Sequence, residues 1–561
     1  MRQREAGARA SRSRAVLAAL VLFYAVLGLL VLAPEAVYSG DIGVKYVQAW
    51  ALAAHGFRTL DIPYPGAFLD PVCEFFPLRA PFVMVTGGST QTIFSPAAAV
   101  LQALGVSVAG FLGFIVVSVV AAAAILYSAW KLSPPQYGTA VLVALGLASP
   151  LWFYAVSGWE HAPAVAFGAA GFAWGVRSRS RFTPLVAGLL VGAGATLRDE
   201  VLLMAPGLLV VVWLRTHRLR PLAAFAGGLL IPLALAATME VWWFHRPVAA
   251  HLRHAVHLAQ TAIGTTDTPD PEIPVLQAFT LRERYEAVVQ YWLLGYGTDW
   301  IIALVAGGLA VALAVQLRWK SSIAVLAWLT IVVAFAARDL HELIVAPKWL
   351  AGLHRVSPYL VFALLPLPAN AADRGWLRPA IALAAAAYLL GAFVGVDTSG
   401  GKSLGPRLLL PLFPILTVSA IVGIAAYLRA GTRPERWIGR AGVLLVCMSI
   451  AMHVCGTIRA YYFRNHDDAA AMRAIAAWRG RVVVADDPFT AQLLFPLYHR
   501  KIILLADSPE LGTRLGTLLA EQRVADALVV SRNAERRVSL TPLHLAHEEQ
   551  RGRMLIQYWR R

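Results

Sequence analysis

The sequence predicts an all-α polytopic membrane protein that carries a small C-terminal α/β domain. Hydrophobic residues make up 58% of the 561 residues and charged residues only 14%, against about 25% charged residues in ordinary globular chains. A water-soluble core cannot bury this much apolar surface, so most of the chain must face lipid. Apolar segments of spanning length recur along the first four fifths of the chain. After about residue 459 the pattern changes to alternating strands and helices.

We expect about thirteen membrane spans, each of about twenty residues. They are placed near residues 15–34, 106–129, 137–156, 162–176, 183–197, 201–214, 222–243, 288–316, 322–337, 350–367, 377–396, 408–428 and 441–457. The apolar run at 15–33 is too long for a signal peptide and is interpreted as a retained first span. One alternating set of loops holds about twenty Lys and Arg in about sixty residues, so the positive-inside rule places that set and the basic N-terminus, 1–14, in the cytoplasm. This orientation accounts for much of the net charge of +17 and argues against a nucleic-acid partner.

The membrane domain, 15–460, is predicted to carry two long extracytoplasmic loops, at 35–104 and 245–287. In the first loop, the stretch Ile42–His55 has apolar residues at helical spacing, which predicts a helix on the membrane surface. The region 461–561 is predicted to be an extracytoplasmic α/β domain. Its strands begin at Arg481, Lys501 and Ala527, and its helices cover Ala469–Trp478 and Pro509–Arg523. It has no Gly-rich phosphate fingerprint, so no cofactor is assigned to it.

Charged and hydrogen-bonding residues are nearly absent from the span centres and recur at the extracytoplasmic boundary. An ion-coupled transporter is expected to place such residues near the midplane of the membrane. A site at the outer boundary instead favours an enzyme that acts on a lipid headgroup. The boundary residues are Asp41, Glu74, Glu160, His161, Arg198, Asp199, Glu200, Glu240, Arg338, Asp339, His341, Glu342, Lys348, Lys402 and Arg407.

Three stretches at this boundary resemble motifs of the GT-C superfamily of membrane glycosyltransferases. They are YSGDIGVKYVQAWAL (Tyr38–Leu52), TLRDEVLLMAP (Thr196–Pro206) and GGKSLGPRLLLPLFP (Gly400–Pro414). The two long loops, after spans one and seven, also resemble that superfamily, and the likeness covers about residues 15–430. The resemblance is to bacterial members that use polyprenyl-phosphate sugars and are related to the protein mannosyltransferase and aminoarabinose transferase type. The sequence departs from their commoner paired acid, because Ile42 follows Asp41.

The resemblance implies a fold, an activity and roles for particular residues. The implied activity is transfer of a sugar, with inversion, from a polyprenyl-phosphate donor to a glycan, lipid or protein acceptor at the outer face of the cytoplasmic membrane. Asp41 and Glu160 are the implied catalytic carboxylates, with Asp41 as general base. Arg407, Lys402 and Arg355 are candidates for holding the donor phosphate. The expected cavity-lining residues are Lys45, His161, Arg198, Glu200, Arg338 and Lys348.

The alternative to these catalytic and binding roles is a purely structural role. Asp41 at the start of a helix can serve as a capping residue, and Arg198 with Glu200 can form an ion pair that only fixes topology. His251, His254 and His257 recur every three residues. On a helix their side chains turn progressively around the axis instead of converging on one point, so no metal is assigned. Cys73 and Cys455 are left unpaired. The competing functions are a transporter or flippase of lipid-linked sugars, a lipid-linked glycan ligase or polymerase, and an assembly subunit without activity.

Overall fold

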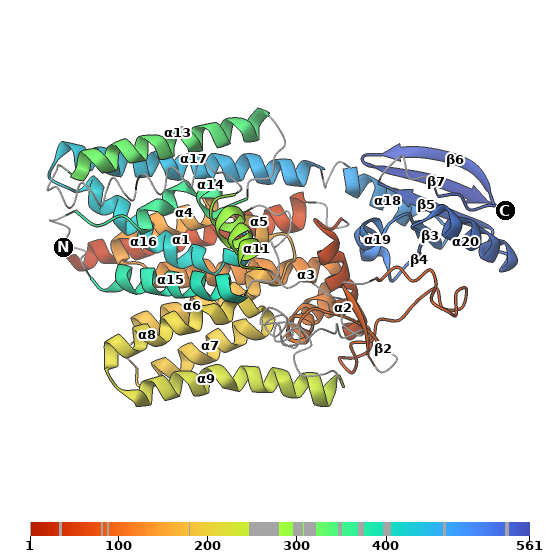
Figure 1. Ribbon diagram of the computed structural model, residues 1–561, viewed down its shortest axis with the longest axis horizontal. Helices are drawn as coiled ribbons and strands as arrows, with labels where there is room; N and C mark the ends of the chain where they lie inside the picture. The colour runs from red at the N-terminus through yellow and green to blue at the C-terminus, as the bar shows by residue number, and fades with distance from the viewer. Residues whose placement is uncertain are drawn as a thin grey trace.

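The protein consists of a helical bundle joined at one end to an α/β domain (Figure 1). The computed structural model describes residues 2–32, 36–79, 82–86, 89–178, 180–245, 280–295, 307, 321–345, 351–368, 375–395, 405–463, 467–532 and 538–561. The N-terminus lies at the far end of the bundle and the C-terminus lies in the α/β domain.

The helices of the described chain range in length from four residues to 37 residues. They are α1 Arg2–Val26, α2 Gly40–Ala54, α3 Pro96–Leu132, α4 Gly138–Leu147, α5 Leu151–Ala155, α6 His161–Arg177, α7 Thr183–Leu197, α8 Met204–Thr216, α9 Leu219–Thr238, α11 Leu281–Tyr285, α13 Ser321–Val345, α14 Leu353–Val356, α15 Leu377–Gly395, α16 Leu412–Leu428, α17 Arg433–Phe463, α18 Ala469–Ala477, α19 Pro488–Leu494 and α20 Pro509–Glu521.

Six helical segments in the described part of the chain are long and apolar enough to cross a membrane. They are Gly7–Val31, Pro96–Leu132, Leu219–Trp243, Ser322–Val345, Leu377–Gly395 and Arg433–Arg459. Thr183–Leu197 and Leu412–Leu428 are shorter apolar helices. The protein is therefore a mostly helical, multi-pass membrane protein. The expected count of about thirteen spans remains a prediction, and most of the expected span 288–316 lies outside the described residues.

Two expected spans are not continuous helices. Residues 137–156 form α4 and then α5, separated at Pro150, whose ring cannot continue the hydrogen-bond ladder of a preceding helix. Of the expected span 350–367, the described residues 351–367 form only the four-residue α14 and a 3₁₀ turn over Pro358–Ala363. This stretch is almost wholly buried, so neighbouring helices rather than lipid surround it, and helix length is not needed there.

The long helix α3 is bent sharply near the middle of its sequence. Ala109 and Gly110 leave the helical conformation, and Gly110 has a φ of 55°, a left-handed value that glycine adopts at little cost. The break divides α3 into two parts, and Phe111 and Phe114 at the start of the second part pack against Tyr46 of α2. The expected span near 106–129 corresponds to the second part.

The α/β domain contains a five-stranded sheet in the order β4-β3-β5-β7-β6. Its three parallel strands, β3, β4 and β5, are the ones that the sequence predicts. Two further strands, β6 and β7, form an antiparallel hairpin against β5. The strands are β3 Val482–Ala485, β4 Ile502–Leu505, β5 Asp526–Ser531, β6 His544–Arg551 and β7 Met554–Arg560, and a separate hairpin in the first loop pairs β1 Val83–Thr86 with β2 Ser89–Thr92.

The two faces of the five-stranded sheet belong to different hydrophobic cores, because neighbouring residues of a strand point to opposite faces. Val483 and Leu505 join the same core as the membrane bundle. Val484 and Leu504 instead pack with α20 and with Leu69 of the first loop. The first loop also pairs with the edge strand, since the Leu505 amide donates to the Phe75 carbonyl. The region 461–561 therefore packs as one unit with the first loop.

Candidate active site

Helix α2 lies where the bundle meets the α/β domain (Figure 1). The predicted helix at Ile42–His55 is present as α2, and it is buried by protein along most of its length rather than lying on a surface. At about 100° per residue, Asp41, Lys45 and Gln48 fall on one side of it. Gln48 ties that side to the first loop, because its amide donates to the Leu60 carbonyl at 2.7 Å and accepts from the Thr92 amide at 3.0 Å.

Asp41 and Arg407 meet at the start of α2, although 366 residues separate them in the sequence. An Arg407 guanidinium nitrogen lies 3.2 Å from the Asp41 carboxylate, with 18% and 23% of the two side chains exposed. The Arg407 guanidinium also lies over the Trp159 ring, 5.5 Å from its centre. The predicted base and the predicted phosphate ligand are thus in direct contact and both remain partly accessible.

Lys45, one turn further along α2, reaches the segment before α6. Its ammonium lies 2.7 Å from the Glu160 carboxylate, and only 4% of each side chain is exposed. Arg198 donates to the same Glu160 oxygen at 3.1 Å and to Glu200 at 3.0 Å. His161 lies 3.8 Å from Glu200. Seven predicted site residues therefore form one cluster: Asp41, Lys45, Glu160, His161, Arg198, Glu200 and Arg407.

Neighbouring charges fix the ionisation of this cluster. Burial alone raises the pKa of Glu160, but Lys45 and Arg198 outweigh it and lower that pKa to about 2. Burial lowers the pKa of Lys45, against the opposing effect of Glu160 and Asp41. Glu160 is therefore a carboxylate at neutral pH.

Several buried polar atoms of the cluster have no hydrogen-bond partner in the described structure. They are Ser39 Oγ, Trp159 Nε1, Glu160 Oε2, both His161 ring nitrogens and Arg407 Nε. An unsatisfied buried polar group costs about 1–3 kcal/mol, and such groups are few in native proteins. Water or a polar ligand could supply the missing partners.

Arg355 is not part of this cluster. Its guanidinium forms two hydrogen bonds with Asp339, at 2.7 and 3.0 Å, and a third with the Gly295 carbonyl. Asp339 is fully buried, so Arg355 has an internal counterion and its role in phosphate binding stays a prediction. Arg338 lies beside this pair, 3.8 Å from Asp339.

The remaining predictions divide between described and undescribed residues. Lys348, Lys402, His251, His254 and His257 lie outside the described residues. Within the described ranges, no group of three or more His, Cys, Asp or Glu is arranged to hold a metal ion. Cys73 and Cys455 are both free thiols.

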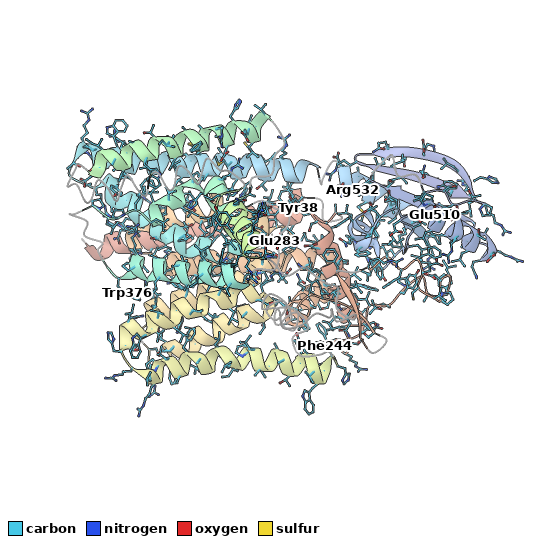
Figure 2. The ribbon with its side chains drawn as sticks, viewed as in Figure 1. Tyr38, Phe244, Glu283, Trp376, Glu510 and Arg532 are labelled. Atoms are coloured by element: carbon cyan, nitrogen blue, oxygen red, sulfur yellow. The ribbon has the colours of Figure 1, made fainter. Side chains whose placement is uncertain are left out.

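Two aromatic residues of the site were missed by the sequence reasoning. Trp159 packs under Arg407, and Phe94 packs under Lys45, whose ammonium is 4.2 Å from the ring centre. Trp159 directly precedes Glu160, which is the one sequence signal that could have identified it. Phe94 offers no such signal, because it lies in the loop after β2. Figure 2 shows Tyr38, another aromatic residue near the start of α2, at the end of the bundle toward the α/β domain.

No protein-family model and no curated protein sequence matches this chain. Among solved structures, the chain is similar to ArnT from Cupriavidus metallidurans in the apo state, with a TM-score of 0.49, 13% identity and 98% coverage of both chains. ArnT from the same organism bound to undecaprenyl phosphate gives a TM-score of 0.47, 13% identity and 97% coverage of both chains. The oligosaccharyltransferase of Archaeoglobus fulgidus gives a TM-score of 0.42 and 9% identity, with 92% of this chain and 69% of that chain covered.

Proposed function

We propose that this protein is a membrane glycosyltransferase of the GT-C type that transfers a sugar from a polyprenyl-phosphate donor to an extracytoplasmic glycan, lipid or protein. The observation that carries the proposal is the Asp41–Arg407 contact within a cluster of unsatisfied polar atoms. It joins a carboxylate that can accept a proton to a guanidinium that can hold a phosphate. Inverting sugar transfer from a lipid phosphate needs both groups within reach of one anomeric carbon.

In the proposed reaction the acceptor hydroxyl oxygen attacks the anomeric carbon of the donor sugar. The new carbon–oxygen bond forms as the bond to phosphate breaks, and the polyprenyl phosphate leaves with the electron pair. Asp41 takes the acceptor proton, a step that contributes about 10²–10⁴-fold to the rate of such reactions. Arg407 stabilises the departing phosphate, because guanidinium groups bind phosphate oxygens bidentately.

Donor binding also activates Asp41 in this proposal. In the structure Arg407 is engaged by the Asp41 carboxylate. A donor phosphate competes for the same guanidinium and draws it away from Asp41, which leaves the carboxylate free to accept the acceptor proton. Glu160 is held by Lys45 and Arg198, so we assign it to positioning Lys45 rather than to proton transfer.

The proposal also includes the side of the membrane on which the site lies. The cluster and the α/β domain are placed outside the cytoplasm and the N-terminus inside, in a cytoplasmic (inner) membrane, because the basic loops follow the positive-inside rule. The competing function is a flippase or transporter of lipid-linked sugars, or a lipid-linked glycan ligase. The concentration of unsatisfied polar groups beside a candidate base favours chemistry at the site over passage through it.

The test is sugar transfer by the purified protein in nanodiscs with a panel of radiolabelled polyprenyl-phosphate sugars. Undecaprenyl phosphate, the lipid bound to the similar ArnT structure, is the first carrier to use. Asp41→Asn is compared with Asp507→Asn, a control carboxylate that is exposed on the α/β domain. We expect Asp41→Asn to lose at least about 100-fold in kcat and the control to retain wild-type rates. Equal transfer by wild type and Asp41→Asn refutes the assignment of the base, and lipid movement between leaflets without transfer favours the flippase.

A further inference from the structure

The face of α2 opposite Asp41 and Lys45 is covered by the α/β domain. At about 100° per residue, Gly43 and Trp50 lie about 160–180° from Asp41 around the helix axis, and Gly40 lies about 100° from it. Helix α19 and the turn Phe495–Leu497 pack along this face. Trp50 meets Tyr498 edge-on, with ring centres 6.1 Å apart. One helix therefore carries candidate catalytic residues on one side and a domain contact on the other.

Gln492 of α19 makes the closest part of this contact. A methyl group placed on Gly40 would overlap the Gln492 side-chain oxygen and lie 3.1 Å from its Cβ. A methyl group placed on Gly43 would overlap the Gln492 backbone carbonyl oxygen. At Gly43 the overlapping atom belongs to the backbone, so only glycine there allows α19 to approach so closely. At Gly40 it belongs to the end of the buried Gln492 side chain, which would have to move.

The contact is also well anchored on the α/β side. Gln492 is 4% exposed, and α19 packs against β3 and β4 in the interior of the domain. Leu493 and Leu494, next in sequence, belong to the same hydrophobic core as Ile42 and Val44 of α2. Close-packed interiors transmit displacements instead of absorbing them. A shift of α19 by a few tenths of an ångström is therefore passed to the first turn of α2, which bears Asp41.

We propose that α19, seated through Gln492 against Gly40 and Gly43, is the positioning element through which the α/β domain sets the place of Asp41 and Lys45. This inference rests on the proposed transferase function and extends it to a role for the C-terminal domain. A productive geometry for proton transfer is narrow, and a misplacement of 1 Å far from the chemistry can cost about 100-fold in rate. The α/β domain thus acts on the reaction without contacting the reacting atoms.

The test is a rescue experiment on two glycines that meet different parts of Gln492. Gly40→Ala is expected to lower kcat about 10-fold or more, with little change in the KM for the donor, because Asp41 is displaced while Arg407 is not. Adding Gln492→Ala removes the overlapping side-chain oxygen and leaves only the Cβ at 3.1 Å, so the double variant is expected to regain most of the kcat. Gly43→Ala, which meets the backbone carbonyl, is expected to lose kcat and not to be rescued by Gln492→Ala. Gly227→Ala is the matched control, since a methyl group on this helical glycine meets nothing within 4 Å.

Hydrogen exchange of the α2 amides provides a readout that does not depend on activity. We expect faster exchange in α2 for Gly40→Ala, restoration in Gly40→Ala with Gln492→Ala, and no change for Gly227→Ala. Unchanged α2 exchange in Gly40→Ala overturns the inference. Altered exchange with wild-type kcat also overturns it, because the contact then does not position the base. If the wild-type protein transfers no sugar, the proposed function fails, while the exchange pattern still decides whether the seating of α19 positions α2.

Discussion

Replacing Glu160 by Gln is the sharpest test of the ionic cluster. Glu160 is the shared acceptor of Lys45 at 2.7 Å and Arg198 at 3.1 Å, in a place where almost no solvent reaches it. The substitution keeps the size of the side chain and removes its charge. It leaves the Lys45 ammonium buried opposite a neutral amide. Breaking a buried ion pair in this way lowers the free energy of unfolding by about 3–5 kcal/mol.

The pKa of Glu160 gives an independent value for the stability that its ion pairs contribute. Since one pKa unit corresponds to about 1.4 kcal/mol, the fall from 4.5 to about 2 amounts to about 3 kcal/mol in favour of the folded state. Because the folded-state pKa is depressed, this stabilisation is complete above the unfolded pKa near 4.5 and is lost as pH falls toward 2. The wild-type protein should therefore lose about 3 kcal/mol across that window, and Glu160→Gln should lack this contribution at every pH.

The assay is denaturant unfolding in detergent micelles, followed by tryptophan fluorescence at several pH values. Glu286→Gln is the matched control, because Glu286 is 41% exposed and pairs with an Arg282 that is 87% exposed. A surface pair of this kind contributes about 0.3–0.5 kcal/mol. The reasoning is refuted if Glu160→Gln costs less than about 1 kcal/mol and the wild-type stability stays flat between pH 4.5 and 2.

Two further predictions concern Arg407 and the α/β domain. Arg407→Lys keeps the charge but loses the planar donor pair, so we expect the KM for the donor to rise about 10-fold in steady-state kinetics, and an unchanged KM would remove Arg407 from phosphate binding. Burial, with Asp487 beside it, raises the pKa of Asp486 from 3.8 to about 6. Because the folded-state pKa is raised, the protonated form is favoured by folding, and that stabilisation is lost as pH rises through about 6. Asp486→Asn should remove this pH dependence from the amide exchange of β3 and β5, and a variant with the wild-type pH profile contradicts the assignment.

Part of the site could be predicted from the sequence because its residues stand at boundaries. Asp41, Glu160, Arg198 and Arg407 each lie where an apolar helix begins or ends, and a charged residue there is costly to place deeper in the membrane. Such positions are visible in a hydropathy profile. The profile shows that these residues share one boundary, but it does not show which of them meet.

Secondary structure was predictable where the residue pattern was strong and local. The buried strands β3, β4 and β5 are continuous apolar runs, as parallel strands covered on both faces are. The edge strand β6 was missed because its sequence, HLAHEEQR, is exposed along its length and has no apolar alternation. Residues 350–367 have the composition of a span, yet the described part, 351–367, folds as two short helical segments, since burial by protein imposes no minimum helix length.

The sequence by itself determined that this chain is a multi-pass membrane protein with a C-terminal α/β unit. Composition and the spacing of apolar residues are properties of the sequence near each position. They therefore indicate membrane helices and strands without any knowledge of how these elements pack together. Only the tertiary structure decided that Asp41 faces Arg407, that Arg355 is occupied by Asp339, and that Gln492 rests on Gly40 and Gly43. The first and the last join residues hundreds of positions apart, and each depends on how close two backbones approach. That approach is set by the packing of the whole molecule, which no local pattern records.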